Sequence, residues 1–186
     1  MGSLEKNKYK VIKNFLSKEE IELAKKYILI RHRQNSTKFD LHQNNNGDTM
    51  FYQDPFTEAL LYNKLKLMEN KTKLKLFPTY SFSRVYTYNS ELTPHKDRPS
   101  CEISVTVMFG SDGTKWPIYM KDNPIELSPG DACIYLGCEI EHSRKHFTGD
   151  WHAQAFLHYV DQNGPNTKYK FDGKQPSLNP TLQSWF

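Results

Sequence analysis

Long apolar segments, paired cysteines and low-complexity linkers are scarce or missing in this chain of 186 residues. No apolar run approaches the roughly 20 residues that a membrane-spanning helix needs, so we expect no transmembrane segment and no membrane partner. The three cysteines include no CxxC pair, which argues against a paired zinc array. An odd cysteine count without a secretory leader indicates a reducing compartment, so we expect no disulfide framework and a cytoplasmic protein.

The chain also lacks Gly/Ser-rich linkers and internal repeats, so we expect a single domain over residues 1–186. Within it the pattern predicts a helical N-terminal part over about 1–75, a β-rich core over about 76–162 and a coil tail over about 163–186. The net charge of +4 is modest, and no basic stripe is interleaved with stacking aromatic residues. The sequence therefore gives no sign of a nucleic-acid partner, and it leaves the oligomeric state open.

Two helices are predicted in the N-terminal part. Ser17 and Glu20 form a capping box, which predicts a helix that begins there and runs to about Leu29. A second helix is predicted from Pro55 to about Glu69. The segment between them, 33–53, is polar and rich in asparagine, so a substrate-covering loop and an uninvolved connection both fit it.

The β-rich core is predicted from residues that alternate between apolar and polar types. Four segments show this period of two or a short apolar run bounded by turn residues. These predicted strands are Tyr80 to Tyr88, Ile103 to Phe109, Ala132 to Leu136 and His152 to Val160.

Two histidines and one aspartate have the spacing of a metal site. Residues i and i+2 of a strand project to the same side, so His95 and Asp97 can converge while Lys96 points away. His142, delivered by a later strand, would complete the set. Two imidazoles and one carboxylate form the facial triad of non-haem Fe(II) oxygenases, which leaves the opposite face of the metal open.

Other metal sites fit the sequence less well. His142 and His146 could chelate zinc from one helical face, but Gly149 and the β-rich flanks argue against a helix there. The cysteines, which are Cys101, Cys133 and Cys138, are interpreted as small buried hydrophobes or surface thiols.

The surrounding motifs resemble those of a known family, the 2-oxoglutarate/Fe(II)-dependent dioxygenases, and within it the branch that contains prolyl 4-hydroxylases. The motifs are Arg84 to Tyr88 ahead of His95 and Asp97, the strand Ile103 to Phe109, and Pro129 to Ala132 ahead of His142. They cover roughly residues 80–160, with a looser match over 11–20. The resemblance implies a mainly β fold, a double-stranded β-helix or jelly roll, with helices supporting its larger sheet.

The resemblance also implies cofactors, a reaction and a substrate. His95, Asp97 and His142 would be the catalytic Fe(II) ligands, with 2-oxoglutarate and dioxygen as cosubstrates, and the family also admits ascorbate. The expected reaction hydroxylates an unactivated C–H bond, with a prolyl residue in a peptide or protein as the leading substrate. Two alternatives stay open: hydroxylation of a free amino acid or small metabolite, and a non-catalytic jelly-roll module that binds a metal or ligand. The residues expected to contact substrate are Arg98, Trp116 and Tyr119.

One departure from the family concerns the cosubstrate. Relatives carry a Lys or Arg on the strand after the distal histidine, at the positions that Trp151 and His152 occupy here. A buried dicarboxylate needs a cationic partner, and Arg144 is the strongest candidate because it lies two residues past His142 and its planar fork suits a carboxylate. A solvated charge in the basic stretch 144–146 fits the spacing equally well. Further hydrogen bonds to 2-oxoglutarate are expected from His152, Tyr86, Tyr88 and Thr106.

Overall fold

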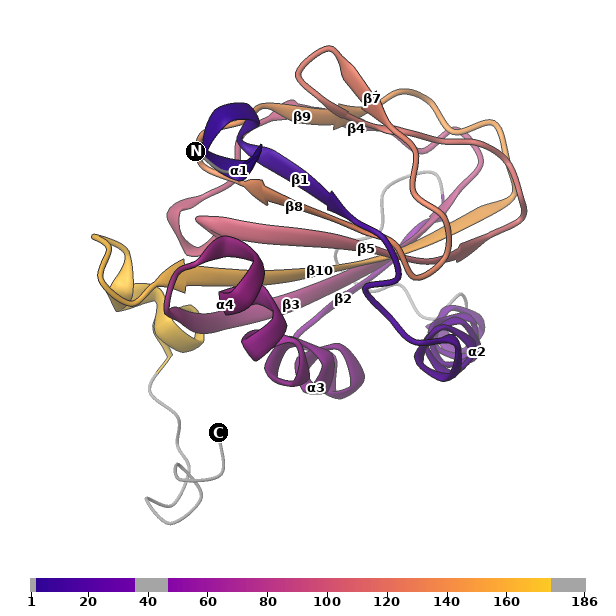
Figure 1. The fold of residues 1–186 in the computed structure, drawn as a ribbon. Helices are drawn as coiled ribbons and strands as arrows, with labels where there is room; N and C mark the ends of the chain where they lie inside the picture. Colours follow the sequence, from indigo (N-terminus) through magenta and orange to yellow (C-terminus); the bar gives the residue numbers. More distant parts are fainter. Residues whose placement is uncertain (1–2, 36–46, 175–186) are drawn as a thin grey trace.

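The computed structural model describes residues 3–35 and 47–174 of the chain. Two antiparallel sheets face each other, and helices cover the outer face of the larger sheet (Figure 1). No helix in these described ranges is both long and apolar enough to cross a membrane. This arrangement confirms the predicted fold class, a mainly β jelly roll with supporting helices, although the two sheets stay separate and no closed barrel forms.

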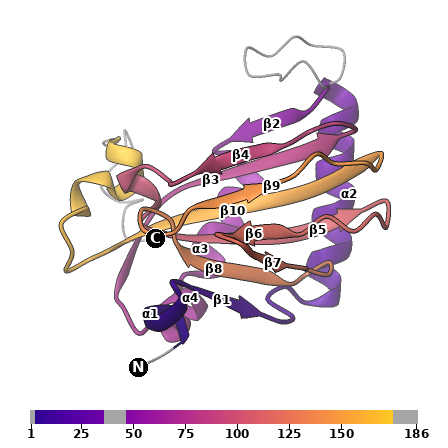
Figure 2. The same ribbon diagram turned by 90° about the horizontal axis from the view of Figure 1, so that it is seen from above.

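The larger sheet has six strands and the smaller has four (Figure 2). The order in the larger sheet is β1 (Tyr9–Ile12), β8 (Ala132–Leu136), β5 (Ile103–Ser111), β10 (Trp151–Asp161), β3 (Leu76–Thr87) and β2 (Thr49–Tyr52). The order in the smaller sheet is β4 (Leu92–His95), β9 (His142–Arg144), β6 (Ile118–Met120) and β7 (Asn123–Ile125). Each of the four predicted strands corresponds to one strand of the larger sheet.

Side chains along β3 alternate between the two faces of the larger sheet. Val85 joins the main apolar cluster, which fills the space between the larger sheet and the helices. Its neighbour Tyr86 points the other way and packs with Trp116, Phe147 and Phe156 between the two sheets. The main core therefore supports the larger sheet from behind, while the space between the sheets holds this aromatic group and a second apolar cluster around Ile118 and Met120.

The helices begin where the sequence predicts, but their ends differ. The capping box forms, because the Glu20 N–H donates to Ser17 Oγ at 3.2 Å and the Ser17 N–H donates to the Glu20 carboxylate at 2.7 Å. Helix α2 (Lys18–Asn35) extends beyond the expected end at Leu29. The single helix expected from Pro55 is divided at Lys64 into α3 (Pro55–Asn63) and α4 (Leu65–Thr72). The ammonium of Lys64 reaches back to both carboxylate oxygens of Glu20 at 2.7 Å, which ties this junction to α2.

Two segments that were expected to be irregular contain regular structure. Strand β2 lies inside the polar segment 33–53 and pairs with β3 at the edge of the larger sheet; residues 36–46 of the expected loop lie outside the described residues. In the expected coil tail, residues Thr167–Gly173 form a 3₁₀ segment, η2, which is interrupted by non-helical backbone at 170–172 and packs against β3. The remaining short elements are helix α1 (Ser3–Asn7) and the 3₁₀ turn η1 (Pro99–Cys101).

Candidate functional site

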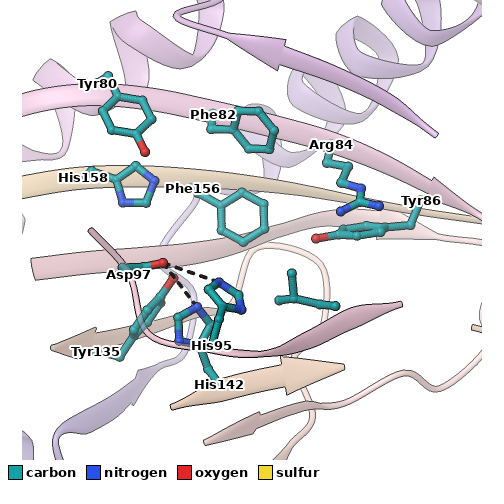
Figure 3. Close-up of a pocket in the computed structure, with 11 residues that line it drawn as sticks. Tyr80, Phe82, Arg84, Tyr86, His95, Asp97, Tyr135, His142, Phe156 and His158 are labelled. Carbon is teal, nitrogen blue, oxygen red and sulfur yellow. Dashed lines mark ion pairs between the residues drawn. The ribbon is translucent and has the colours of Figure 1, made fainter. Parts of the chain in front are cut away.

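The three predicted metal ligands converge at the end of the smaller sheet (Figure 3). His95 on β4 is paired in register with His142 on β9, and Asp97 follows just after β4. The Oδ1 atom of Asp97 lies 3.6 Å from His95 Nε2 and 3.5 Å from His142 Nε2. Ligand atoms of all three side chains lie within 4.8 Å of one another. The structure thus brings the three residues together, while their binding of a metal stays a prediction.

Backbone carbonyl groups hold both histidine rings in an orientation that suits ligation. His95 Nδ1 lies 2.8 Å from the Thr93 carbonyl oxygen, and His142 Nδ1 lies 3.3 Å from the carbonyl oxygen of Ile140. Each contact calls for a proton on Nδ1, which leaves the Nε2 lone pair free to point at the gap beside Asp97. A hydrogen bond from the second ring nitrogen commonly fixes the tautomer of a metal-ligating histidine in this way.

Two of the three side chains have charge states that suit a divalent cation. Burial opposes ionisation of Asp97, but the neighbouring histidines outweigh it, and the pKa of Asp97 is lowered. Burial lowers the pKa of His142, which keeps its ring neutral. The neighbouring Asp97 carboxylate instead raises the pKa of His95, whose ring must be neutral to bind a metal. One ionised carboxylate and a neutral imidazole are the forms that bind Fe(II).

A pocket of about 220 Å³ opens in front of these three residues, between the two sheets. The larger sheet supplies its aromatic wall, and the ligands stand on the opposite side (Figure 3). The residues that line it are Tyr80, Phe82, Arg84, Tyr86, Leu92, His95, Asp97, Tyr135, His142, Phe156 and His158.

Arg84 is the arginine in this wall, and its charge is already compensated. Its Nε donates to Asp48 Oδ2 at 2.7 Å, its Nη2 forms an ion pair with the same oxygen, and Asp48 is fully buried. The guanidinium carbon also lies 4.2 Å from the centre of the Tyr86 ring. No role for Arg84 or Asp48 was predicted from the sequence, although Arg84 lies two residues before Tyr86 on β3 and both line the pocket.

Arg144 has the opposite character, because it is buried without a compensating charge. Only 3 % of it is exposed, and no Asp or Glu of the described part of the chain pairs with it. Its Nη1 donates to the Trp116 carbonyl oxygen, and its guanidinium carbon lies 4.7 Å from the Trp116 ring centre. Among residues 3–35 and 47–174, its Nε has no hydrogen-bond partner. Burial lowers the pKa of Arg144 to about 10, so the side chain remains cationic at neutral pH.

His152 presents a second unpartnered donor near Arg144. Thr106 donates to Gln154 Oε1 at 3.0 Å, so the Gln154 amide nitrogen faces His152 Nε2, at 2.9 Å, as a donor. This arrangement places the proton of the neutral ring on Nδ1, which is buried and has no hydrogen-bond partner in the described part of the chain. Burial, followed by the charge of Arg144, lowers the pKa of His152 to about 3. Both side chains pack on the Trp116 ring, and two orphaned donors with one positive charge suit a carboxylate.

The remaining predicted residues lie in different places. Trp116 belongs to the buried group around Arg144. Tyr88 is 68 % exposed, and neither it nor Tyr119, which lies under Lys145, lines the pocket. Arg98 forms an ion pair with Asp172 of η2 at 3.1 Å and lies over the ring of pocket residue Tyr80.

A second group of potential ligands, Asp97, Cys101 and His158, lies beside the first. Burial raises the pKa of Cys101 to about 12, and its thiol contacts the Tyr80 hydroxyl at 3.1 Å. Burial lowers the pKa of His158 to about 4, and its Nδ1 lies 2.8 Å from Ser104 Oγ. A thiol binds a metal as the thiolate, and the Cys101 thiol stays protonated, so the two-histidine group is the better candidate for a metal site. The alternative zinc pair, His142 with His146, is not on a helix, because β9 is extended.

Comparison with known proteins identifies the fold. No family model matches the sequence, and no curated protein matches it either. Among solved structures, EctD from S. alaskensis in its apoform is similar with a TM-score of 0.69 and 12% identity, covering 94% of this chain and 80% of that one. A prolyl-4-hydroxylase from Pseudomonas putida has a TM-score of 0.61 and 14% identity, covering 86% and 96%. The viral collagen prolyl hydroxylase from Paramecium Bursaria Chlorella virus-1, in complex with 2OG, has a TM-score of 0.61 and 13% identity, covering 85% and 98%. At these identities the similarity shows the fold, which is the jelly roll of 2-oxoglutarate/Fe(II) oxygenases.

Proposed function

We propose that this protein is a non-haem Fe(II)- and 2-oxoglutarate-dependent dioxygenase that hydroxylates an unactivated C–H bond. The observation that carries the proposal is the pairing of two features. His95, Asp97 and His142 converge on one pocket, and the uncompensated cation of Arg144 lies two residues beyond His142 on the same strand. The reaction converts substrate C–H, dioxygen and 2-oxoglutarate into substrate C–OH, succinate and carbon dioxide.

In this proposal the protein holds the reactants, and iron with 2-oxoglutarate supplies the oxidising power when bound. The Nε2 atoms of His95 and His142 and the Oδ1 atom of Asp97 are the metal ligands. All three come from one side of the pocket, so the side that faces the aromatic wall stays open for cosubstrate and substrate.

Arg144 replaces the cation that relatives carry on the following strand. An arginine without a counter-ion is costly to bury, and a carboxylate that pairs with its planar fork would offset this cost. His152 Nδ1 offers a second donor, and Thr106 contributes through Gln154, which fixes the tautomer of His152. The Tyr86 ring centre lies 4.8 Å from that of Trp116, so Tyr86 lies between this group and the open pocket. Tyr88 was proposed in the same role, but its exposure places it apart from these residues.

A prolyl residue in a peptide or protein is the substrate that we place first. Two of the similar structures are prolyl hydroxylases, and Arg98 with Tyr80 lies beside the metal ligand Asp97, where a peptide could approach. Hydroxylation of a free amino acid or small metabolite is the second candidate. Succinate formation that increases with a proline-rich peptide, but not with free amino acids, would support the first candidate and reject the second.

The decisive experiment is an anaerobic titration of the Fe(II)-loaded protein with 2-oxoglutarate. Bidentate chelation of iron by the keto acid gives a visible metal-to-ligand charge-transfer band, and we expect this band to saturate. Arg144→Ala should bind iron normally but require more 2-oxoglutarate, whereas Lys145→Ala, a change at the exposed neighbouring position, should match the wild type. A folded, iron-bound protein that gives no band and no succinate would contradict the proposal and support a non-catalytic binding module.

A further inference from the structure

The two oxygens of Asp97 face different surroundings. Oδ1 faces the Nε2 atoms of both histidines. Oδ2 points away from them and lies 3.2 Å from the hydroxyl oxygen of Ser104. Ser104 is fully buried and comes from β5 of the larger sheet, whereas the two histidines come from the smaller sheet. A contact from the opposite sheet therefore distinguishes one carboxylate oxygen from the other.

The Ser104 hydroxyl has one proton and three acceptors within reach. These are Asp97 Oδ2 at 3.2 Å, the Cys101 carbonyl oxygen at 3.0 Å and His158 Nδ1 at 2.8 Å. An ionised carboxylate is the strongest acceptor of the three, which favours donation to Asp97. The short contact with His158 is then satisfied if His158 carries its proton on Nδ1 and donates to Ser104 Oγ. The three side chains form a directed chain from His158 through Ser104 to Asp97.

Gly137 limits the movement of Asp97 from another side. Its carbonyl oxygen accepts a hydrogen bond from the Asp97 N–H at 2.9 Å. A Cβ atom at this position would lie 2.5 Å from Asp97 Oδ2 and 2.3 Å from the Cys101 carbonyl oxygen. Both distances are too short for real contacts, so the backbone approaches the carboxylate closely only because residue 137 is glycine.

We infer that Ser104 is a positioning residue for the metal site. Its hydroxyl holds Oδ2 of Asp97, so that Oδ1 is the atom presented to the metal beside the two histidines. His158 orients this hydroxyl, and Gly137 closes the space into which the carboxylate could turn. The inference rests on the proposed metal site and adds to it three residues, none of which is a metal ligand. Outer contacts of this kind commonly change metal affinity by about 10- to 100-fold.

Co(II) is a suitable probe, because its d–d bands report both binding and coordination geometry without turnover. We expect Ser104→Ala to weaken Co(II) binding by about 10- to 100-fold and to change the band pattern. Ser83→Ala is the matched control, because Ser83 is equally buried in the larger sheet and its hydroxyl has no hydrogen-bond partner. The control should bind Co(II) as the wild type does. Equal affinity and equal spectra for Ser104→Ala and wild type would overturn the inference.

The hydrogen-bond direction gives a second test that needs no variant. In the ¹⁵N NMR spectrum of the metal-free protein we expect neutral His158 to be protonated on Nδ1. Protonation on Nε2 would mean that Ser104 donates to His158 and not to Asp97, which would contradict the chain. Failure of the wild type to bind Co(II) would instead overturn the proposed metal site itself, so the two failures are distinguishable.

Discussion

Arg144 has two opposing effects on the protein, one on stability and one on binding. A buried charge without a partner destabilises a fold, and replacement by an apolar side chain of similar size is often neutral or stabilising. We therefore expect Arg144→Met to leave the free energy of unfolding of the metal-free protein unchanged or higher. The same change should weaken 2-oxoglutarate binding by about 2 to 5 kcal/mol, because the cosubstrate carboxylate would lose its charged partner.

Urea unfolding of the metal-free protein and 2-oxoglutarate titration of the iron-bound protein measure these two effects separately. Lys145→Met, at an exposed position, is the control and should change neither quantity. A large loss of stability in Arg144→Met would show that the arginine is a structural group, satisfied by Trp116 alone.

The metal ligands give a second prediction at this scale. We expect His95→Ala, Asp97→Ala and His142→Ala each to lower the Fe(II) affinity. Loss of a contact that only orients a ligand commonly costs about 10- to 100-fold in metal affinity. Each of these variants removes a proposed ligand itself, so the loss should be at least as large. Fe(II) affinity can be measured anaerobically by competition with a chelator. His146→Ala, which lies outside the group, should retain wild-type affinity. Full affinity in any of the three variants would remove that residue from the site.

At the scale of elements, strands were predicted best where an apolar or alternating pattern continued without interruption. Strands β3 and β5 were predicted from their alternation and β8 from a short apolar run, and together with the predicted β10 they make up most of the larger sheet. Strand β2 was missed because it has only four residues and adjoins an asparagine-rich segment. Asp48 lies just before it, and its bond to Arg84 joins segments that are distant in sequence. Periodicity contains no information about such a contact.

The same limit applies to the candidate site. The convergence of His95 and Asp97 was predictable because an i, i+2 spacing brings two side chains to one side at the end of a strand, although Asp97 itself lies just past β4. Ser104 and His158 were not, because each became relevant only when β5 and β10 paired and turned both side chains toward Asp97. Gly137 gave no signal in the sequence, since its role depends on the backbone of a neighbouring turn.

Asp54 joins two helices, and its loss should affect both. Its carboxylate caps α3 through the Phe56 N–H at 3.1 Å and accepts from Tyr27 and Arg31 of α2 at 2.7 and 3.2 Å. Loss of an N-cap alone costs about 0.5 to 2 kcal/mol, so we expect Asp54→Ala to lower the free energy of unfolding by about 2 kcal/mol or more. Asp54→Asn keeps the N-cap, so its free energy of unfolding should fall by less. Denaturant midpoints of the two variants provide the test, and equal losses would contradict the capping role.

For the whole molecule, two buried histidines predict how stability depends on pH. Burial lowers the pKa of His152 to about 3 and that of His158 to about 4, from an ordinary value of 6.5. At a pH between the folded and the ordinary pKa values, the two histidines bind protons in the unfolded chain but not in the folded protein. Stability is therefore full above about pH 6.5 and falls as the pH decreases. Each histidine contributes about 1.4 kcal/mol per pH unit, so we expect the free energy of unfolding to fall by about 1 to 3 kcal/mol for each unit of pH decrease in this range.

Urea midpoints measured from pH 7 to pH 4 provide the test. The double variant His152→Gln, His158→Gln should show a shallower pH dependence than the wild type, whatever its stability at pH 7. His146→Gln should keep the wild-type slope, because His146 is exposed and its contact with Glu91 is on the surface. An unchanged slope in the double variant would assign the acid sensitivity to other groups.

The division of the pocket between two sheets has a consequence for how the proposed enzyme can diversify. The proposed metal ligands stand on the short strands β4 and β9 and on the residues just after β4, whereas Phe82 and Phe156 of the facing wall belong to long strands backed by helices. Neither phenylalanine belongs to the contacts that run from His158 through Ser104 to Asp97, whereas the Tyr80 ring packs on His158. A lineage, or a designer, that exchanges the two phenylalanines would alter the substrate space and keep the proposed metal site.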